Sequence, residues 1–291
     1  MAEETKGEAR PVKMSVEPSV SSEDLARQVA LEEGNKRDAQ AGFVVPRDFV
    51  KLPSKGKVYP PNSSLHNAED VEVRQMTASE EDILTSRSLI RSGKAIDLVI
   101  QNCLMDKSVN VDDLIAGDKN AIMIALRVSG YGKDYSIDTA CPSCSEETTF
   151  EFDLSSLKMK TLDIDPVSEG DNKFDFKTPS GRDIEFKILT SGEQKSIADS
   201  QSKIKRMSGQ EVDRNVTTRF KHQILSVDGD SKPAQIQKYS DMMPVSDSRA
   251  FRTFVDEIEP DIIMKQMFSC PSCGNSQEVD LPITVEFFWP E

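Results

Sequence analysis

Polar and apolar residues alternate in a short stretch in the first third of the chain and then change to a helical spacing. The run VEVRQM at 71–76 alternates with the two-residue period of a β-strand. Thr77 and Glu80 follow with the spacing of a capping box, in which a threonine begins a helix and a glutamate reaches back to it. Apolar positions over 95–104 and 119–128 continue at helical spacing. The pattern predicts a strand, a capped helix and two further helices, in that order.

The same order of positions recurs later in the chain. IEFKILTSGE at 184–193 matches VEVRQMTASE at 71–80 in its apolar, charged and capping positions, at a constant offset of 113 residues. Upstream of each copy, PSG at 179–181 echoes PSKG at 53–56. Two strand-then-helix pieces can look alike by chance, but the ordered match extends to both ends of each copy. We interpret it as a duplication of one small unit, because the period is too long for a solenoid.

Each copy ends in the tetrapeptide CPSC, at 141–144 and again at 270–273, and a strand-like segment follows each. The offset is now 129 residues, so the second copy holds about 16 extra residues, which we place in the polar stretch 200–244. The expected fold is α+β, with two duplicated strand–helix–knuckle subdomains joined by a split, zinc-ribbon-like four-cysteine site. The expected domains are 43–165 and 166–291.

The first 42 residues are expected to form a disordered acidic tail. They are polar and rich in glutamate, and no aromatic residue precedes Phe43. Such a segment cannot bury enough apolar surface to fold alone. A short helix capped by SSED at 21–24 is the ordered element expected there.

Composition narrows the environment and the partners. The chain has 291 residues, of which 37% are hydrophobic and 30% charged. It contains no apolar run of about 18 residues, and its start lacks the apolar core of a secretory signal. We therefore expect an intracellular protein whose thiols stay reduced. The net charge of −14 disfavours a nucleic-acid partner, which usually needs a basic face.

Four of the five cysteines lie in the two CPSC copies, at Cys141, Cys144, Cys270 and Cys273. A two-residue gap lets one turn supply two thiolates, and four thiolates close a tetrahedral structural zinc site. A stretch of 125 residues separates the two pairs, whereas the usual spacing in a ribbon is about 15–20 residues. The duplication predicts instead that each subdomain donates one pair to one shared Zn²⁺ per chain. The alternatives are redox-active pairs, disulfides and a site that has lost its metal.

No catalytic constellation is recognisable. His66 and His222 have no nucleophile beside them in the sequence, and Cys103 lies on a predicted apolar helix as a small core residue. Phosphate-binding, zinc-protease and nucleophile-elbow motifs are missing from the sequence. A four-cysteine zinc also leaves no open position for water. We therefore expect no enzymatic activity and no small-molecule substrate.

Two apolar segments are weaker candidates for contact with a partner. One contains Phe43 and Val44, and the other contains Phe287, Phe288 and Trp289 near the end of the chain. Aromatic residues commonly anchor protein interfaces. A last strand packed on the core would explain the C-terminal aromatics equally well.

Several of these segments together resemble a known family. LPSKGKVYP at 52–60, VEVRQMTASEEDILTSRSLIRSG at 71–93 and DLIAGDKNAIMIALRVSGYGKDY at 113–135, followed by CPSC, look like the baseplate hub proteins of contractile-tailed phages of the T-even type. The likeness covers roughly residues 43–160. It implies a non-enzymatic role in tail morphogenesis, as a hub subunit or a chaperone-like hub assembly factor.

The resemblance also implies a location and partners. The protein would act in the host cytoplasm during assembly or in the tail baseplate of the virion, and it would contact other hub or tail proteins. The resemblance supplies no metal ligands, and the proposed ligands follow from the cysteine spacing alone. Two other functions remain open from the sequence: a zinc-ribbon module that binds nucleic acid or transcription machinery, and a CxxC thiol–disulfide oxidoreductase.

Overall fold

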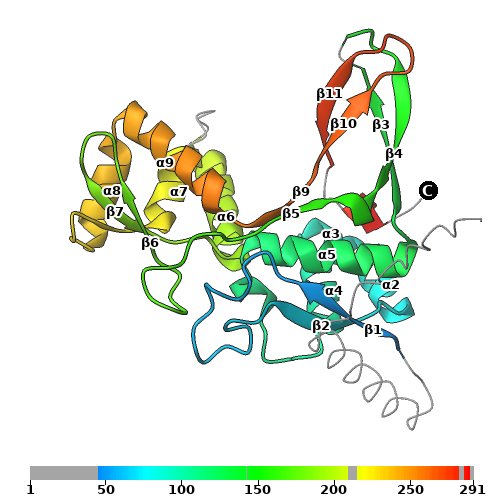
Figure 1. Ribbon diagram of the computed structural model, residues 1–291, viewed down its shortest axis with the longest axis horizontal. Coiled ribbons are helices and arrows are strands. Elements are labelled where there is room, and N and C mark those ends of the chain that lie inside the picture. Colours follow the sequence, from blue (N-terminus) through cyan, green and yellow to red (C-terminus); the bar gives the residue numbers. More distant parts are fainter. Residues whose placement is uncertain (1–44, 142, 209–214, 282–284, 289–291) are drawn as a thin grey trace, which may run out of the picture. The chain divides into compact units, whose positions relative to one another are not determined.

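The computed structural model consists of helices and short antiparallel strands, as the sequence predicts for an α+β protein (Figure 1). The structure describes residues 45–141, 143–208, 215–281 and 285–288, which all belong to one compact unit, Val45–Glu291. The expected acidic tail and its short helix lie outside the described residues. None of the helices described is both long and apolar enough to cross a membrane.

The elements up to residue 160 form a β-ribbon, a set of helices and a hairpin. They are β1 (Arg47–Lys51), β2 (Asp70–Arg74), α2 (Ala78–Thr85), α3 (Arg87–Arg91), α4 (Ala95–Cys103), the 3₁₀ turn η1 (Val111–Asp113), α5 (Ala116–Tyr131), β3 (Asp134–Ala140), β4 (Glu147–Asp153), η2 (Leu154–Ser156) and β5 (Lys158–Lys160). β1 pairs antiparallel with β2, and β3 with β4. The strand predicted over 71–76 is β2, and the helices predicted over 95–104 and 119–128 are α4 and α5.

The elements after residue 160 begin with strands and helices and again end in a hairpin and a 3₁₀ turn. They are β6 (Phe174–Lys177), β7 (Asp183–Phe186), α6 (Ser191–Ser208), α7 (Asn215–Gln223), β8 (Ile224–Val227), α8 (Pro233–Met242), α9 (Val245–Ile258), β9 (Asp261–Ile263), β10 (Lys265–Ser269), β11 (Ser276–Asp280) and η3 (Val285–Phe288). β6, β7 and β8 form one antiparallel sheet, and β10 pairs with β11. α6, α7, β8 and α8 take up the polar stretch in which the extra residues of the second copy were expected.

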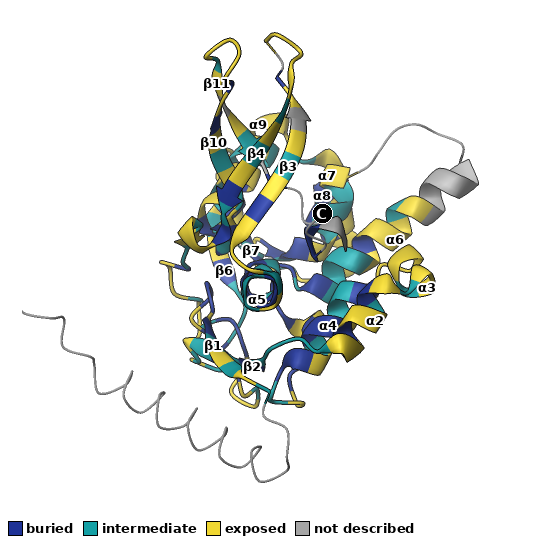
Figure 2. Ribbon diagram, turned by 90° about the vertical axis from the view of Figure 1, so that its right-hand side faces the viewer, coloured by how far each residue is buried: buried dark blue, intermediate teal, exposed yellow. Residues whose placement is uncertain are grey.

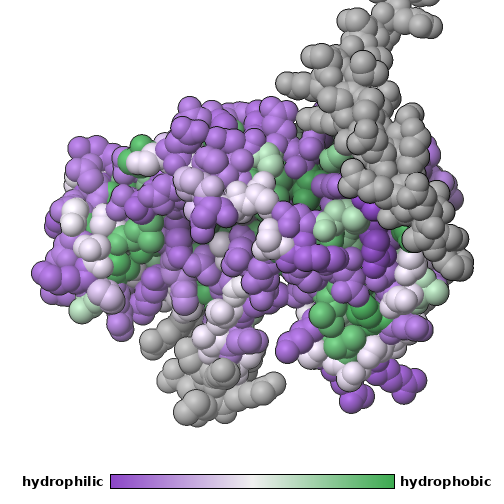
Figure 3. Space-filling view, turned by 90° about the horizontal axis from the view of Figure 1, so that it is seen from below, coloured by the Kyte–Doolittle hydropathy of each residue, from purple (hydrophilic) through white to green (hydrophobic). Residues whose placement is uncertain are grey.

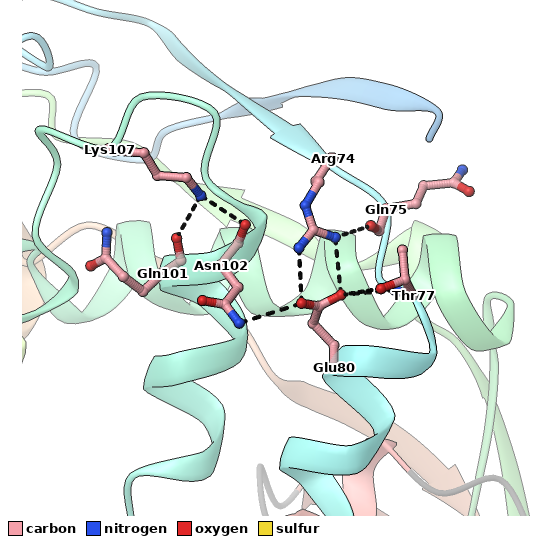
Figure 4. A network of polar contacts seen from close by, with 7 residues as sticks. All are labelled: Arg74, Gln75, Thr77, Glu80, Gln101, Asn102 and Lys107. Atoms are coloured by element: carbon pink, nitrogen blue, oxygen red, sulfur yellow. Dashed lines mark hydrogen bonds and ion pairs between the residues drawn. The ribbon is translucent and has the colours of Figure 1, made fainter. Parts of the chain in front are cut away.

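The capping box predicted from the sequence is present at the start of α2 (Figure 4). The Glu80 carboxylate accepts hydrogen bonds from the backbone N–H of Thr77 at 2.9 Å and from its hydroxyl at 2.8 Å. Both guanidinium nitrogens of Arg74 also donate to it, at 2.8 and 2.9 Å. The Glu80 side chain is 1% exposed, so this ion pair links the end of β2 to α2 within the protein interior.

A threonine, a glutamate and a basic residue also meet at the start of α6. The Glu193 carboxylate accepts from the backbone N–H of Thr190 at 3.1 Å, and the hydroxyl of Thr190 accepts from the N–H of Glu193 at 3.3 Å. Lys187 pairs with Glu193 as Arg74 pairs with Glu80. The charged pair at α6 is more exposed than its counterpart, with the Glu193 side chain 30% exposed.

α5 is the central helix of the apolar core (Figure 2). It contacts β1, α4, η2, η3 and β9, and its first turn lies directly against the chain that enters β9. A side chain at Gly117 would meet the carbonyl oxygen of Pro260 at 2.0 Å, so only glycine permits this approach. β5 and β9 then pair antiparallel, which joins the first and second halves of the chain in one small sheet.

The outside of the molecule is mainly polar. On the face that Figure 3 shows, polar side chains dominate and apolar ones gather in small separate groups. This surface agrees with the high content of charged residues in the sequence.

Candidate metal centre

Two antiparallel hairpins lie beside each other and extend away from the helices (Figure 1). β3 and β4 form the first hairpin, from the pair Asp134–Asp153 to the pair Ala140–Glu147. β10 and β11 form the second. Each hairpin reverses direction at a CPSC sequence, so the cysteines lie at the far ends of both hairpins.

The two turns are built alike. In the first, the N–H of Ser145 donates to the carbonyl of Cys141 at 2.7 Å. In the second, the N–H of Gly274 donates to the carbonyl of Cys270 at 2.8 Å. Ser145 and Gly274 follow the second cysteine of each pair, and both have positive φ angles, 60° and 71°. The two turns therefore share a left-handed backbone conformation directly after the second cysteine.

The four sulfur atoms form one cluster. Cys141 Sγ lies 3.7 Å from Cys273 Sγ, and Cys144 Sγ lies 3.7 Å from Cys270 Sγ. All four lie within 4.8 Å of one another, and no disulfide joins them. Four thiolates around Zn²⁺ at about 2.3 Å have tetrahedral edges of about 3.8 Å. The measured separations therefore fit a metal tetrahedron, with each hairpin supplying two ligands.

An apolar layer between the hairpins supports the cluster. Phe150 of the first hairpin meets Phe268 of the second edge to face. Phe268, Cys141 and Cys270 are buried together in a small core, separate from the main one. Cys144 and Cys273 are exposed, so the cluster has an apolar side and a side open to solvent.

Backbone amides and neighbouring thiols set the acidity of the cluster. The amides of Cys144 and Ser143 lower the pKa of Cys141 to about 7. The amide of Glu146 also favours the thiolate of Cys144, but desolvation and the thiols of Cys273, Cys141 and Cys270 together raise its pKa to about 12. Cys141 thus ionises readily, whereas Cys144 resists loss of its proton.

The other residues singled out by the sequence lie elsewhere. Phe287 and Phe288 are fully buried in the main core, where Phe287 packs edge to face on Tyr135. This burial favours the packing interpretation over contact with a partner. The expectation that the packed end is a strand is wrong, because these residues form the 3₁₀ turn η3. Phe43, Val44 and Trp289 lie outside the described residues.

The remaining cysteine belongs to the core, as the sequence predicted. Cys103 is 0% exposed and lies in the main apolar cluster. Burial is the main cause that raises its pKa, to about 11. It therefore remains a neutral thiol, unlike a metal ligand.

Sequence reasoning missed two buried carboxylates with matching partners. Asp118, in the first turn of α5, accepts from the N–H and hydroxyl of Ser54 at 2.9 and 2.6 Å. Asp247, in the first turn of α9, accepts from the N–H of Ser180 at 3.2 Å and from its hydroxyl. Both aspartates are 0% exposed. The serines belong to the PSKG and PSG echoes, which were the available signal for this contact.

Comparison with known proteins gives one family. The model of a family described as T4 bacteriophage base plate protein matches residues 46–289. No curated protein and no solved structure matches the chain. Because the match covers most of its length, the chain belongs to this family.

Proposed function

We propose that this base plate protein is a non-enzymatic structural component of the baseplate hub, or the chaperone-like factor that assembles the hub, and that one bound Zn²⁺ clamps its two hairpins together. Membership of the family supports a role in the phage tail, among other tail proteins. The single observation that carries the metal is the cluster of four sulfurs with 3.7 Å edges.

Zinc fits the donor set better than other common cations. Soft thiolates in a tetrahedral arrangement select Zn²⁺ or iron, whereas Mg²⁺ and Ca²⁺ require oxygen ligands. Cys141, Cys144, Cys270 and Cys273 would hold the ion and leave no position for a water molecule. The metal would therefore supply stability and not chemistry.

We further propose that the chain consists of two copies of one unit. The capping glutamates Glu80 and Glu193, the buried aspartates Asp118 and Asp247 and the two CPSC turns support this, because each pair makes equivalent contacts in its own half. In this arrangement each copy provides half of the metal site, and the ion holds together parts of the chain that are distant in sequence.

Two other functions have less support. A ribbon that binds nucleic acid needs basic residues, yet residues 134–157 contain no lysine, arginine or histidine. In a CxxC oxidoreductase the two thiols of one motif exchange with each other. Here each short sulfur contact joins cysteines of different hairpins.

Elemental analysis of purified, tag-free protein tests the metal site. About one zinc per chain is expected, and Cys141→Ser should bring the ratio close to zero. Cys103→Ser is the matched control and should keep the metal, because Cys103 lies in the other core cluster. A protein that is purified reduced and carries no metal, or two metals, would contradict the shared site.

Quantitative mass spectrometry of purified phage tails and of infected-cell extracts tests the hub role. A hub subunit should be present in finished tails, in a number that fits the symmetry of the hub. An assembly factor should occur in the extract, bound to hub proteins, and be missing from finished tails. The hub role would be refuted if the chain is missing from finished tails and is also not bound to hub proteins in the extract.

A further inference from the structure

The outer face of the β3–β4 hairpin is covered with carboxylates. Side chains alternate along both strands, so that Tyr135 and Phe152 point inward and are buried. The residues of the opposite face lie outward, and they include Asp134, Asp138, Glu147, Glu151 and Asp153. Figure 2 shows this hairpin as largely exposed along its length.

The two strands of this face contain no lysine or arginine. Asp134 lies directly opposite Asp153, and like charges in this position are destabilising. Among the described residues, the ion pair on this face is Lys133 Nζ with Asp153 Oδ2, at 2.7 Å and at the base of the hairpin. The sequence places no cation between Lys133 and Lys158.

The sheet in the second half provides a comparison. On the outer face of β6 and β7, Lys177 lies opposite Asp183 and forms an ion pair at 3.3 Å. Asp175 and Glu185 also lie opposite each other there, so this face too is mainly acidic, but Lys177 supplies a cation within its strands. The β3–β4 face differs from it because its two strands contain no lysine or arginine beside their carboxylates.

The face is also hollowed near the knuckle. A depression of about 370 Å³ is lined by Asp138, Ala140, Glu147, Thr148 and Thr149. A lysine or arginine side chain could lie in it with its charged end near two carboxylates. The four-cysteine site would add to the negative potential of this face, because four thiolates around Zn²⁺ carry a net charge of about −2.

We propose that the outer face of the β3–β4 hairpin is a docking surface for a lysine- and arginine-rich segment of another base plate protein. Charge complementarity identifies the chemistry of this partner, and the proposed base plate role identifies its class. Long basic side chains would neutralise Asp138, Glu147 and Glu151, whose strands carry no lysine or arginine. The docking surface lies next to the metal centre, so the clamp would hold it at a fixed angle to the second hairpin.

A fluorescent octalysine peptide, titrated by anisotropy at about 50 and about 150 mM NaCl, tests the surface in the full-length protein. The test variant is Asp138→Asn/Glu147→Gln/Glu151→Gln. The matched control is Asp175→Asn/Asp183→Asn/Glu185→Gln, which removes the same charge from the β6–β7 face. The first variant should weaken binding about tenfold and the control less than about twofold, since each lost surface pair has a small effect of its own.

A second variant, Ser136→Lys, keeps every carboxylate and adds one cation to the same face. This variant should also weaken octalysine binding. It provides a second test in case the triple variant fails to fold. Equal weakening by the test and control variants would refute the proposal, as would octalysine that does not bind. Competition by Ca²⁺ at about millimolar concentration would identify a cation site instead and would refute protein docking.

The metal content of every variant is measured in parallel. Wild-type protein without zinc that still binds octalysine at this face would contradict the metal centre alone. Protein with one zinc per chain and no preference for this face would contradict the docking surface alone.

Discussion

The ion pair between Arg74 and Glu80 gives the sharpest test of how this fold is stabilised (Figure 4). Glu80→Gln keeps the size of the side chain and removes its charge. The amide oxygen of glutamine can still accept hydrogen bonds, but its NH2 group replaces the second acceptor and faces donors of Arg74 or Thr77. The guanidinium of Arg74 would then lose its counter-charge beside a fully buried side chain, which is more costly than losing an exposed pair.

The structure gives the size of this effect. Burial alone would raise the pKa of Glu80, but hydrogen bonds from Arg74 and Thr77 outweigh it and lower the pKa from its usual 4.5 to about 2. A pKa lowered this far corresponds to about 3 kcal/mol of stabilisation at neutral pH. Because the folded pKa lies below the unfolded one, this stabilisation is complete above about pH 4.5. It is lost as the pH falls through about 2, so that roughly half of it remains at pH 3.

Urea unfolding followed by circular dichroism at pH 7 and at pH 3 measures this difference. Glu80→Gln should lower the free energy of unfolding by about 3 kcal/mol at pH 7 and by roughly half of that at pH 3. Glu193→Gln is the matched control at the equivalent helix start and should cost less than about 1 kcal/mol, since its pair is partly exposed. Equal losses for the two variants, or a loss for Glu80→Gln that does not depend on pH, would refute this account.

Three further changes test other parts of the structure. Cys270→Ser should remove the zinc and lower the melting temperature, whereas chelator should have no further effect on this variant; a normal zinc content by elemental analysis would contradict the site. Asp118→Asn should lower the free energy of unfolding in urea by about 2–4 kcal/mol, because the amide cannot accept from all the donors that surround the carboxylate. A decrease in this free energy below about 0.5 kcal/mol would show that these contacts contribute little. Arg127→Lys should lower the free energy of unfolding by about 2 kcal/mol and speed hydrogen exchange in η3. One ammonium cannot replace the guanidinium donors to the carbonyls of Phe287, Gly132 and Asp134. Unchanged exchange in η3 would contradict the role of Arg127 in holding η3 against α5.

Local patterns predicted the parts of the fold that depend on neighbouring residues. The strand β2 and the capping box at Thr77 are encoded within about ten residues, and the structure has both. The two CPSC turns could be matched because the repeat supplied a second, distant example of the same local order. That match led to four cysteines that the structure brings within 4.8 Å of one another.

Long-range contacts between single residues were beyond sequence reasoning. Asp118 follows a helix start, where an aspartate usually complements the helix dipole in solvent. Its burial depends on Ser54, 64 positions earlier in the chain. Arg127 looks like an ordinary helix residue, yet its guanidinium donates to a carbonyl 160 positions away, at Phe287. The C-terminal aromatics are consecutive, a pattern too short to separate a strand from a turn, and the packing of Phe287 on Tyr135 is a contact across the chain that no local pattern contains.

The separation of the two knuckles has a consequence for how the metal is acquired. In an ordinary ribbon the ligands lie about 15–20 residues apart, so metal can organise them before the rest of the domain folds. Here 125 residues lie between Cys144 and Cys270, and both hairpins must be in place before four thiolates meet. The β5–β9 pair at the base of the hairpins brings the two halves together independently of the cysteines. Metal binding would then depend on the folding of both halves, so that zinc content reports whether the whole chain has folded and not whether one local turn has formed.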